Sequence, residues 1–196
     1  MIFRPQPTHP HLRARHQGQA LDLRPFRRGE APIFAKHIEG ILTQTNAVDF
    51  LLTFPRPFRP GHARRRIHET HGWLRENRGW SLAIQWQGQL VGQAQIVCHP
   101  PRNSLAEIAY WIARPFQGQG LALSAMKPLI DAAVQHWPLE KIEATVVPEN
   151  QASLKILTRL GFCKPKLARI PYRIQGGWRQ KHAELLIYTR PAILPT

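Results

Sequence analysis

A strand, a glycine-containing loop and a helix follow one another between residues 106 and 136, and this stretch constrains the fold more than any other. The apolar run Ile108 to Ala113 is rich in strand-forming residues and stops at Arg114-Pro115, because proline disfavours helical backbone in the residue before it. After Gln117-Gly118-Gln119-Gly120, the apolar residues of Leu121 to His136 recur at helical spacing. Such a loop points several backbone N–H groups at one spot, at the positive end of a helix. We therefore predict an anion site, with a phosphate ester as the first hypothesis.

Two closely spaced glycines do not by themselves identify the anion, because a tight turn between a strand and a helix often needs the same residues. The spacing also differs from the dinucleotide fingerprint G-x-G-x-x-G and from the nucleoside-triphosphate loop G-x-x-x-x-G-K-[ST]. The six residues from Gln117 to Ala122 read Q-G-Q-G-L-A. They resemble the Q/R-x-x-G-x-G/A signature of the GCN5-related N-acetyltransferases (GNAT), which cradles the pyrophosphate of acetyl-CoA.

Length and composition favour one domain. A chain of 196 residues with 43% hydrophobic residues can bury one sizeable core but is short for two full domains. We expect a single domain over residues 20–190, a basic and disordered arm over 1–19, and a short tail over 191–196. No apolar run approaches the roughly 18 residues that a membrane helix needs, so we expect a cytoplasmic protein without membrane contact.

The net charge of +15 favours acidic partners such as coenzyme phosphates, acidic protein segments or nucleic acid, although it also fits a surface that only keeps the protein soluble. Its densest basic cluster is Arg64-Arg65-Arg66, in a segment with a helical pattern, where a solvated face is the default. Cys98 and Cys163 lie far apart, and the ten histidines complete no zinc pattern. We therefore predict two reduced thiols and no metal.

Hydrophobic periodicity and turn residues predict the other elements. Strands are expected at 21–26, 80–86, 90–98, 105–113, 141–147, 162–169 and 182–189. Helices are expected at 29–45, 61–77, 121–136 and 150–160, the third kinked at Pro128 and the fourth capped by Asn150 and ended by Gly161. Residues 50–60 and 171–180 are expected as loops. Pro25 is expected either to end the first strand or to place it at a sheet edge.

The order of these elements and three further motifs narrow the resemblance to one subgroup. The motifs are Leu23-Arg24-Pro25-Phe26, Ala106-Glu107-Ile108-Ala109-Tyr110-Trp111, and Asn150-x-x-Ser153 followed by Leu160-Gly161-Phe162. They resemble the RimJ/RimL-type enzymes, which acetylate the N-termini of ribosomal proteins. The resemblance implies the acyl-CoA N-acyltransferase fold, an α+β (α/β) fold. Such a fold has a mixed, mostly antiparallel sheet, here of about six to seven strands, with helices on both faces and a splayed strand pair that holds acetyl-CoA.

By this resemblance, acetyl-CoA is the co-substrate and its contacts come from two sides of the splayed pair. Main-chain groups near the end of one strand pair with the pantetheine arm, namely those of Trp111, Ile112 and Ala113. The pyrophosphate is bound by the N–H groups of Gln117, Gly118, Gln119, Gly120, Leu121 and Ala122. Asn150 and Ser153 lie across the gap, close to the thioester sulfur. The subgroup often has Glu in the first turn of the following helix, where this chain has Ser124.

The same resemblance suggests catalytic residues. Ser153 is the candidate that gives a proton or hydrogen bond to the departing thiolate, although a serine near a helix start also bonds locally to the backbone. Glu107 is the candidate base for the amine proton, but a surface carboxylate paired with an arginine explains it equally well, and Glu69 is a second choice. Tyr110, Trp111 and Trp178 are candidates for the lining of an acceptor tunnel, although aromatic residues in strands more often belong to the core.

We therefore expect an enzyme that transfers acetyl from acetyl-CoA to a primary amine by direct attack, with a protein N-terminal α-amine, for instance that of a ribosomal protein, as the first hypothesis. One alternative is a small amine such as a polyamine or an aminoglycoside. Another is a non-catalytic basic protein that binds RNA or the ribosome through Arg64-Arg65-Arg66 and the N-terminal arm. Neither the acceptor nor the oligomeric state, monomer or homodimer, follows from the sequence.

Overall fold

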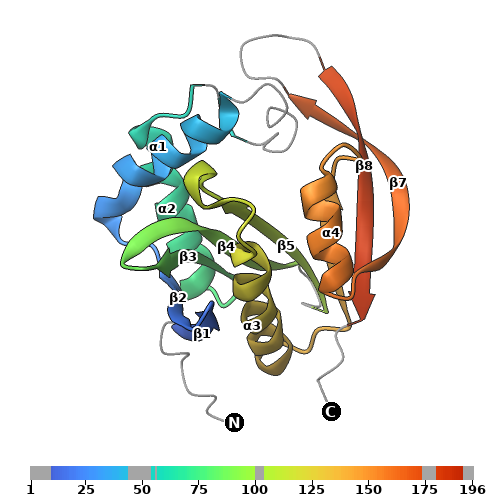
Figure 1. The fold of residues 1–196 in the computed structure, drawn as a ribbon. Coiled ribbons are helices and arrows are strands. Elements are labelled where there is room, and N and C mark those ends of the chain that lie inside the picture. The colour runs from blue at the N-terminus through green and yellow to red at the C-terminus, as the bar shows by residue number, and fades with distance from the viewer. Residues whose placement is uncertain (1–9, 44–53, 56, 100–103, 174–179, 192–196) are drawn as a thin grey trace.

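A mixed sheet of eight strands runs through the molecule and carries helices on both faces (Figure 1). The computed structural model describes residues 10–43, 54–55, 57–99, 104–173 and 180–191. The strands are Leu12–His16 (β1), Gln19–Pro25 (β2), Gly79–Trp86 (β3), Gln89–His99 (β4), Leu105–Ile112 (β5), Lys141–Val146 (β6), Cys163–Arg173 (β7) and Gln180–Pro191 (β8). The α-helices are Ala31–Leu42 (α1), Pro60–Arg75 (α2), Leu121–His136 (α3) and Gln151–Arg159 (α4), with short 3-10 helices at Arg28–Glu30 (η1) and Arg114–Phe116 (η2).

The strand order β1-β2-β3-β4-β5-β6-β8-β7 combines an antiparallel meander with one parallel pair. β1 to β5 pair antiparallel with their neighbours. The turns Gln17-Gly18 and Gln87-Gly88 have positive φ at both residues, which suits tight hairpins. α3 then returns the chain so that β6 lies parallel to β5, and β8 rather than β7 pairs with β6. The predicted mixed, mostly antiparallel sheet is confirmed, with β1 as an additional strand.

Two apolar cores lie on opposite faces of this sheet. Along β3, Leu82 and Ile84 pack into the core with α3, whereas Ala83 packs into the core with α1 and α2. β3 is therefore buried along nearly its whole length. Burying a large apolar side chain contributes about 1.5–3 kcal/mol, and fully buried examples occur on both sides, such as Phe34 from α1 and Met126 from α3.

β5 and β6 separate halfway along their length. Their parallel pairing runs only from Leu105 opposite Lys141 to Ile108 opposite Ala144. β5 continues to Ile112, while the remainder of β6 pairs only with β8 within the described chain. The expected splayed strand pair is present, and it opens toward the end of β5 that leads into the glycine loop.

The segment expected to be a disordered arm contains a strand, and the expectation is wrong for residues 12–16. β1 pairs with β2 from Leu12 opposite Leu23 to His16 opposite Gln19. Leu12 and Ala14 pack against the α3 core. Leu12 and Ala14 alternate with arginines, as in a half-buried strand, and the prediction of a disordered arm over 1–19 did not take this into account. Residues 1–9 lie outside the described part of the chain.

Three prolines had been given structural predictions. Pro25 is the last residue of β2, as one of the two expectations held. α3 continues through Pro128 as a single helix. Pro171, expected in a loop, lies in β7, which is at the edge of the sheet where the missing N–H of proline is tolerated.

The motif around Arg24 also has a structural task. The Arg24 guanidinium pairs with the Glu30 carboxylate, both largely buried, and this pair ties the end of β2 to η1.

None of the described helices is both long and apolar enough to cross a membrane.

Candidate active site

The loop between β5 and α3 presents a row of unused backbone N–H groups. Gly118 and Gly120 have φ angles of +76° and +84°, a left-handed conformation that glycine adopts without strain. No acceptor in the described chain bonds the N–H groups of residues 118–123, and the first helical bond runs from Ser124 N to Gly120 O at 3.2 Å. These groups stand at the N-terminus of a helix of 16 residues, where the dipole is positive. The loop can therefore bind a diphosphate.

Gln117 differs from the other residues predicted for this task. Its backbone N–H donates to Arg114 O at 3.2 Å, because η2 uses it to close a turn. Its side-chain Nε2 donates to Ile112 O at 2.9 Å and so holds the loop against the end of β5. The expected anion contact through the Gln117 amide is therefore not available in this structure. Leu123, which the sequence analysis did not name, carries a further unbonded N–H group.

His16 supports the loop from behind. Its Nδ1 lies 2.9 Å from Ser124 Oγ in the first turn of α3. The imidazole also lies against Gly120, since a Cβ built on that glycine would be 3.6 Å from His16 Cε1. The side chain is only 8% exposed and packs edge-on against Trp86. β1, from the segment expected to be disordered, thus positions the start of α3.

Part of the β5 main chain faces the splay. Ala113 N donates to Val91 O of the β4 side at 2.8 Å. Because successive residues of a strand point their N–H and C=O groups to opposite sides, Trp111 also faces β4, whereas Tyr110 and Ile112 face the gap. Of the three residues predicted to pair with a pantetheine arm, only Ile112 has its main-chain groups on the open side. Tyr110 was not among the residues predicted for this role.

Tyr110 and Ser153 meet across the splay. The Tyr110 hydroxyl lies 2.7 Å from Ser153 Oγ. Ser153 N donates to Asn150 Oδ1 at 3.0 Å, which confirms Asn150 as the cap of α4 and places that side-chain oxygen on the helix rather than in the gap. Burial raises the pKa of Tyr110 to about 12, so its hydroxyl stays protonated at neutral pH. A hydroxyl pair therefore stands on the α4 wall of the splay.

Glu107 lies on the other face of the sheet. Odd-numbered and even-numbered residues of β5 point to opposite faces, and Trp111 belongs to the α1–α2 core while Ile108 belongs to the α3 core. The Glu107 carboxylate accepts from Thr145 Oγ1 at 3.1 Å and lies 3.6 Å from His99 Nε2. Glu107 directly precedes Ile108, the last residue of β5 that pairs with β6, so it lies at the closed end of the splay. The structure does not bring it together with Ser153.

Trp111 is fixed by a buried polar chain. Its Nε1 donates to Gln93 Oε1 at 2.6 Å, and Gln93 Nε2 donates to Ser81 Oγ at 2.7 Å. Its ring stacks on Phe34 at 5.3 Å between centroids. Trp111 is therefore a core residue that sets the position of β5 beside the splay. Trp178, the other tryptophan considered for an acceptor tunnel, lies outside the described residues.

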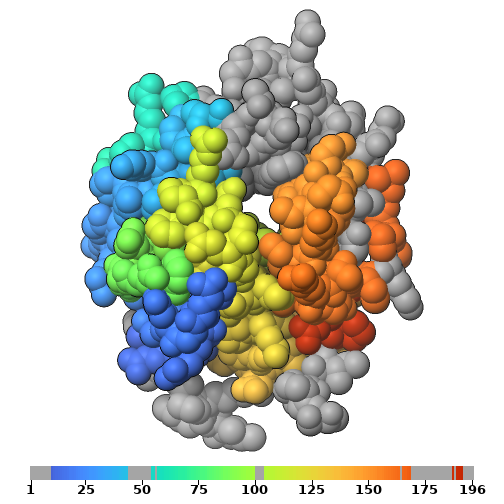
Figure 2. Space-filling model, in the orientation of Figure 1, coloured from blue at the N-terminus to red at the C-terminus, as the bar shows by residue number. Residues whose placement is uncertain are grey.

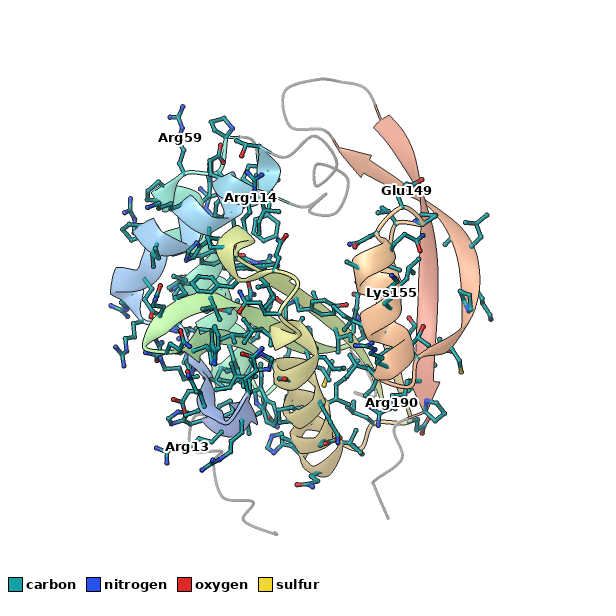
Figure 3. The ribbon with its side chains drawn as sticks, viewed as in Figure 1. Arg13, Arg59, Arg114, Glu149, Lys155 and Arg190 are labelled. Atoms are coloured by element: carbon teal, nitrogen blue, oxygen red, sulfur yellow. The ribbon has the colours of Figure 1, made fainter. Side chains whose placement is uncertain are left out.

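A hollow opens between the N-terminal end of α3 and the side of α4, as the space-filling view shows (Figure 2). Figure 3 labels one cationic residue on each of the two neighbouring elements, Arg114 on η2 and Lys155 on α4. Free amides at one end, unpaired β5 main chain along the side and a hydroxyl pair on the far wall suit a long, slender ligand with a diphosphate.

The described side chains include no group of three or more His, Cys, Asp and Glu that could hold a metal ion. Both cysteines are free, as predicted.

The Tyr110 hydroxyl and the His16 side chain are parts of the site that were not predicted from the sequence. Two weak signals were available for them: Tyr110 falls on the same β5 face as Ile108 and Ile112, and His16 is in register with the alternating Leu12 and Ala14.

The chain is similar to known proteins in sequence and in fold. Residues 20–163 match the family described as Acetyltransferase (GNAT) domain. The chain is 28% identical over 111 residues to the putative ribosomal N-acetyltransferase YdaF of Bacillus subtilis (strain 168), covering 57% of this chain and 58% of that protein. It is 33% identical over 72 residues to the ribosomal protein uS5-alanine N-acetyltransferase of Escherichia coli (strain K12), covering 37% of each.

These alignments are partial, since the chain spans about half the length of the curated relatives it matches. The structural similarity is more extensive. Mycobacterium smegmatis RimJ in complex with CoA-disulfide superposes with a TM-score of 0.72 at 24% identity, over 93% of this chain and 87% of that one. At this identity the superposition shows the fold.

Proposed function

The chain belongs to the GNAT acetyltransferase family, and on that premise we propose that it transfers the acetyl group of acetyl-CoA to the α-amine at a protein N-terminus. The observation that carries the proposal is the row of unbonded N–H groups of residues 118–123 beside the splay of β5 and β6. Ribosomal-protein N-termini are the first acceptors to test, because similar proteins are named for that activity.

The residues present fit the co-substrate. The amides of residues 118–123 match a diphosphate, and the open main-chain groups of Tyr110 and Ile112 match the amides of a pantetheine arm. Acetyl-CoA supplies the activated acyl group. Because the coenzyme would enter beside α3 and α4, we place the approach of the acceptor on the opposite side of the sheet, next to α1 and α2.

The chemistry requires a neutral amine, a base and an acid. As the amine nitrogen bonds to the carbonyl carbon, the carbon–sulfur bond breaks, and the sulfur needs a proton. Ser153 Oγ gives that proton or a hydrogen bond, and the Tyr110 hydroxyl, protonated and 2.7 Å away, supports it. Glu107 accepts the proton of the amine, directly or through a water, from the face of the sheet opposite Ser153.

The test is acetyl-CoA turnover against peptides with free N-termini, the same peptides with blocked N-termini, polyamines and aminoglycosides. We expect turnover with free N-termini only, and a loss of about 10²-fold or more in kcat for Ser153→Ala and Glu107→Gln, as for groups that move protons. Thr158→Ala is the matched control, because Thr158 is also on α4 but bonds to Leu154 O.

Three results would contradict parts of the proposal. Turnover with polyamines or aminoglycosides but not peptides would refute the acceptor. Full rates in Ser153→Ala and Glu107→Gln would refute the two catalytic assignments. The absence of acetyl-CoA binding would refute the co-substrate.

A further inference from the structure

A cavity of about 360 Å³ lies along α2, separate from the splay of β5 and β6. One wall is aromatic and comes from the residues before the helix, Phe54 and Phe58. The other wall is polar and comes from successive turns of α2, with His62, Arg65, Arg66 and Glu69. The lining thus combines two guanidinium groups, one carboxylate, one imidazole and two phenyl rings. A cavity of this size holds one or two side chains of a peptide rather than a nucleic acid helix.

Arg66 is a cation whose charge is poorly compensated by the protein. Its Nε is buried and lacks a hydrogen-bond partner among the described residues. The nearest carboxylate, that of Glu69, is 3.9 Å from Arg66 Nη1. The guanidinium instead lies 5.8 Å from the Phe54 ring and 5.4 Å from the Trp73 ring. Desolvation lowers the pKa of Arg66, so removal from water works against the charged form. An anion in the cavity would pair with the accessible part of the guanidinium, since the Arg66 side chain is 30% exposed.

The aromatic wall is held in place before any ligand binds. Phe58 N donates to Glu39 Oε2 of α1 at 2.9 Å, and the Phe58 ring is 4% exposed. Phe58 contacts Phe34 at 5.8 Å, and Phe34 in turn stacks on Trp111 of β5 at 5.3 Å. The cavity therefore lies two ring contacts from β5, on the α1–α2 face of the sheet, opposite α3 and α4.

We propose that this cavity binds an acidic side chain of the acceptor polypeptide, with Arg65 and Arg66 holding its carboxylate and the phenylalanines contacting its aliphatic part. The net charge of +15 favours the same class of partner by long-range attraction. Guanidinium groups suit a carboxylate because they donate paired hydrogen bonds to it. The assignment of the ligand to an acceptor rests on the acetyl transfer proposed above.

Arg65→Gln and Arg64→Gln form a matched pair for the test. Both arginines are exposed on α2 and both substitutions remove one charge, but only Arg65 lines the cavity. The acceptors are free N-terminal peptides that carry Glu or Asp at one of positions 2–5, or the isosteric Gln or Asn. We expect Arg65→Gln to raise KM for acidic peptides about tenfold, because it removes a charge-assisted hydrogen bond to the carboxylate. Arg64→Gln should leave KM within about twofold, as for a surface charge.

Binding of acidic peptides with acetylated N-termini, measured by calorimetry, separates this inference from the proposed function. If the blocked peptide binds and Arg65→Gln weakens it while no peptide is acetylated, the cavity assignment stands and the proposed activity fails. If peptides are acetylated with equal KM for acidic and amide versions, the activity stands and the cavity assignment fails. Equal effects of Arg64→Gln and Arg65→Gln would also overturn it, because they would indicate general surface attraction. The assignment would also be overturned if Arg65→Gln weakened the binding of a short RNA more than the binding of the acidic peptide.

Discussion

Gly120→Ala tests whether the left-handed loop at the start of α3 is a binding device. Gly120 has φ of +84°, and a Cβ there would meet only His16 Cε1 at 3.6 Å, an ordinary contact. The cost of the substitution therefore comes from backbone strain, about 1–2 kcal/mol. Gly88→Ala is the matched control, because Gly88 has φ of +74° in the β3–β4 turn with no atom within 4 Å of its Cβ.

The two variants should lose similar stability but differ in ligand response. For a chain of this size about 1 kcal/mol shifts Tm by roughly 2–4 °C, so each apo variant should melt about 2–8 °C below the parent. Acetyl-CoA at 100 times the parent Kd stabilises the parent by about 2.7 kcal/mol. If strain at residue 120 turns the neighbouring amides away and weakens binding about tenfold, the same concentration gives about 1.4 kcal/mol.

Thermal melts with and without acetyl-CoA measure this difference. The ligand-induced rise in Tm should be unchanged for Gly88→Ala and about halved for Gly120→Ala, each compared with its own apo form. A full rise in Gly120→Ala at the same acetyl-CoA concentration, 100 times the parent Kd, would refute the assignment of these amides to the diphosphate.

Three further predictions follow from single side chains. Tyr110→Phe removes the hydroxyl 2.7 Å from Ser153 Oγ, so steady-state kinetics should show kcat about tenfold lower with KM for acetyl-CoA unchanged, and an unchanged kcat would contradict its support of the acid. Burial by itself raises the pKa of Glu30, but hydrogen bonds and charge, chiefly those of Arg24, bring it below the usual value. Glu30 therefore stabilises the fold above its unfolded pKa of about 4.3, and this stability is lost as pH falls through the lower folded pKa. The free energy of unfolding in urea should therefore fall less steeply with decreasing acidic pH for Glu30→Gln than for the parent. Equal slopes for the two proteins would argue against the ion pair. Burial raises the pKa of the Cys98 thiol to about 11, so thiol reagents at neutral pH should label the exposed second cysteine first and Cys98 only with unfolding, and early double labelling would contradict its burial.

Much of the fold could be predicted because its signals are local. The Gln87-Gly88 turn, the cap at Asn150 and the stop at Gly161 each depend on the backbone preferences of a few neighbouring residues, and all three are present in the structure. The loop from Gly118 to Ala122 was recognised for the same reason, since left-handed glycines before a helix leave amides unbonded wherever they occur.

The sequence by itself determined most of the strands and helices and the position of the glycine loop before α3, but not β1, because periodicity and turn chemistry act over a few residues. The tertiary structure alone decided that β1 supports that loop through His16 and that the Gln117 N–H donates to Arg114 O within η2. It also decided that the Tyr110 hydroxyl contacts Ser153 and that Glu107 lies on the other face of the sheet. Contacts between residues as far apart as His16 and Ser124, 108 positions along the chain, depend on how the strands are ordered in the sheet. That order is set by packing both faces of the sheet at once, which no local pattern encodes.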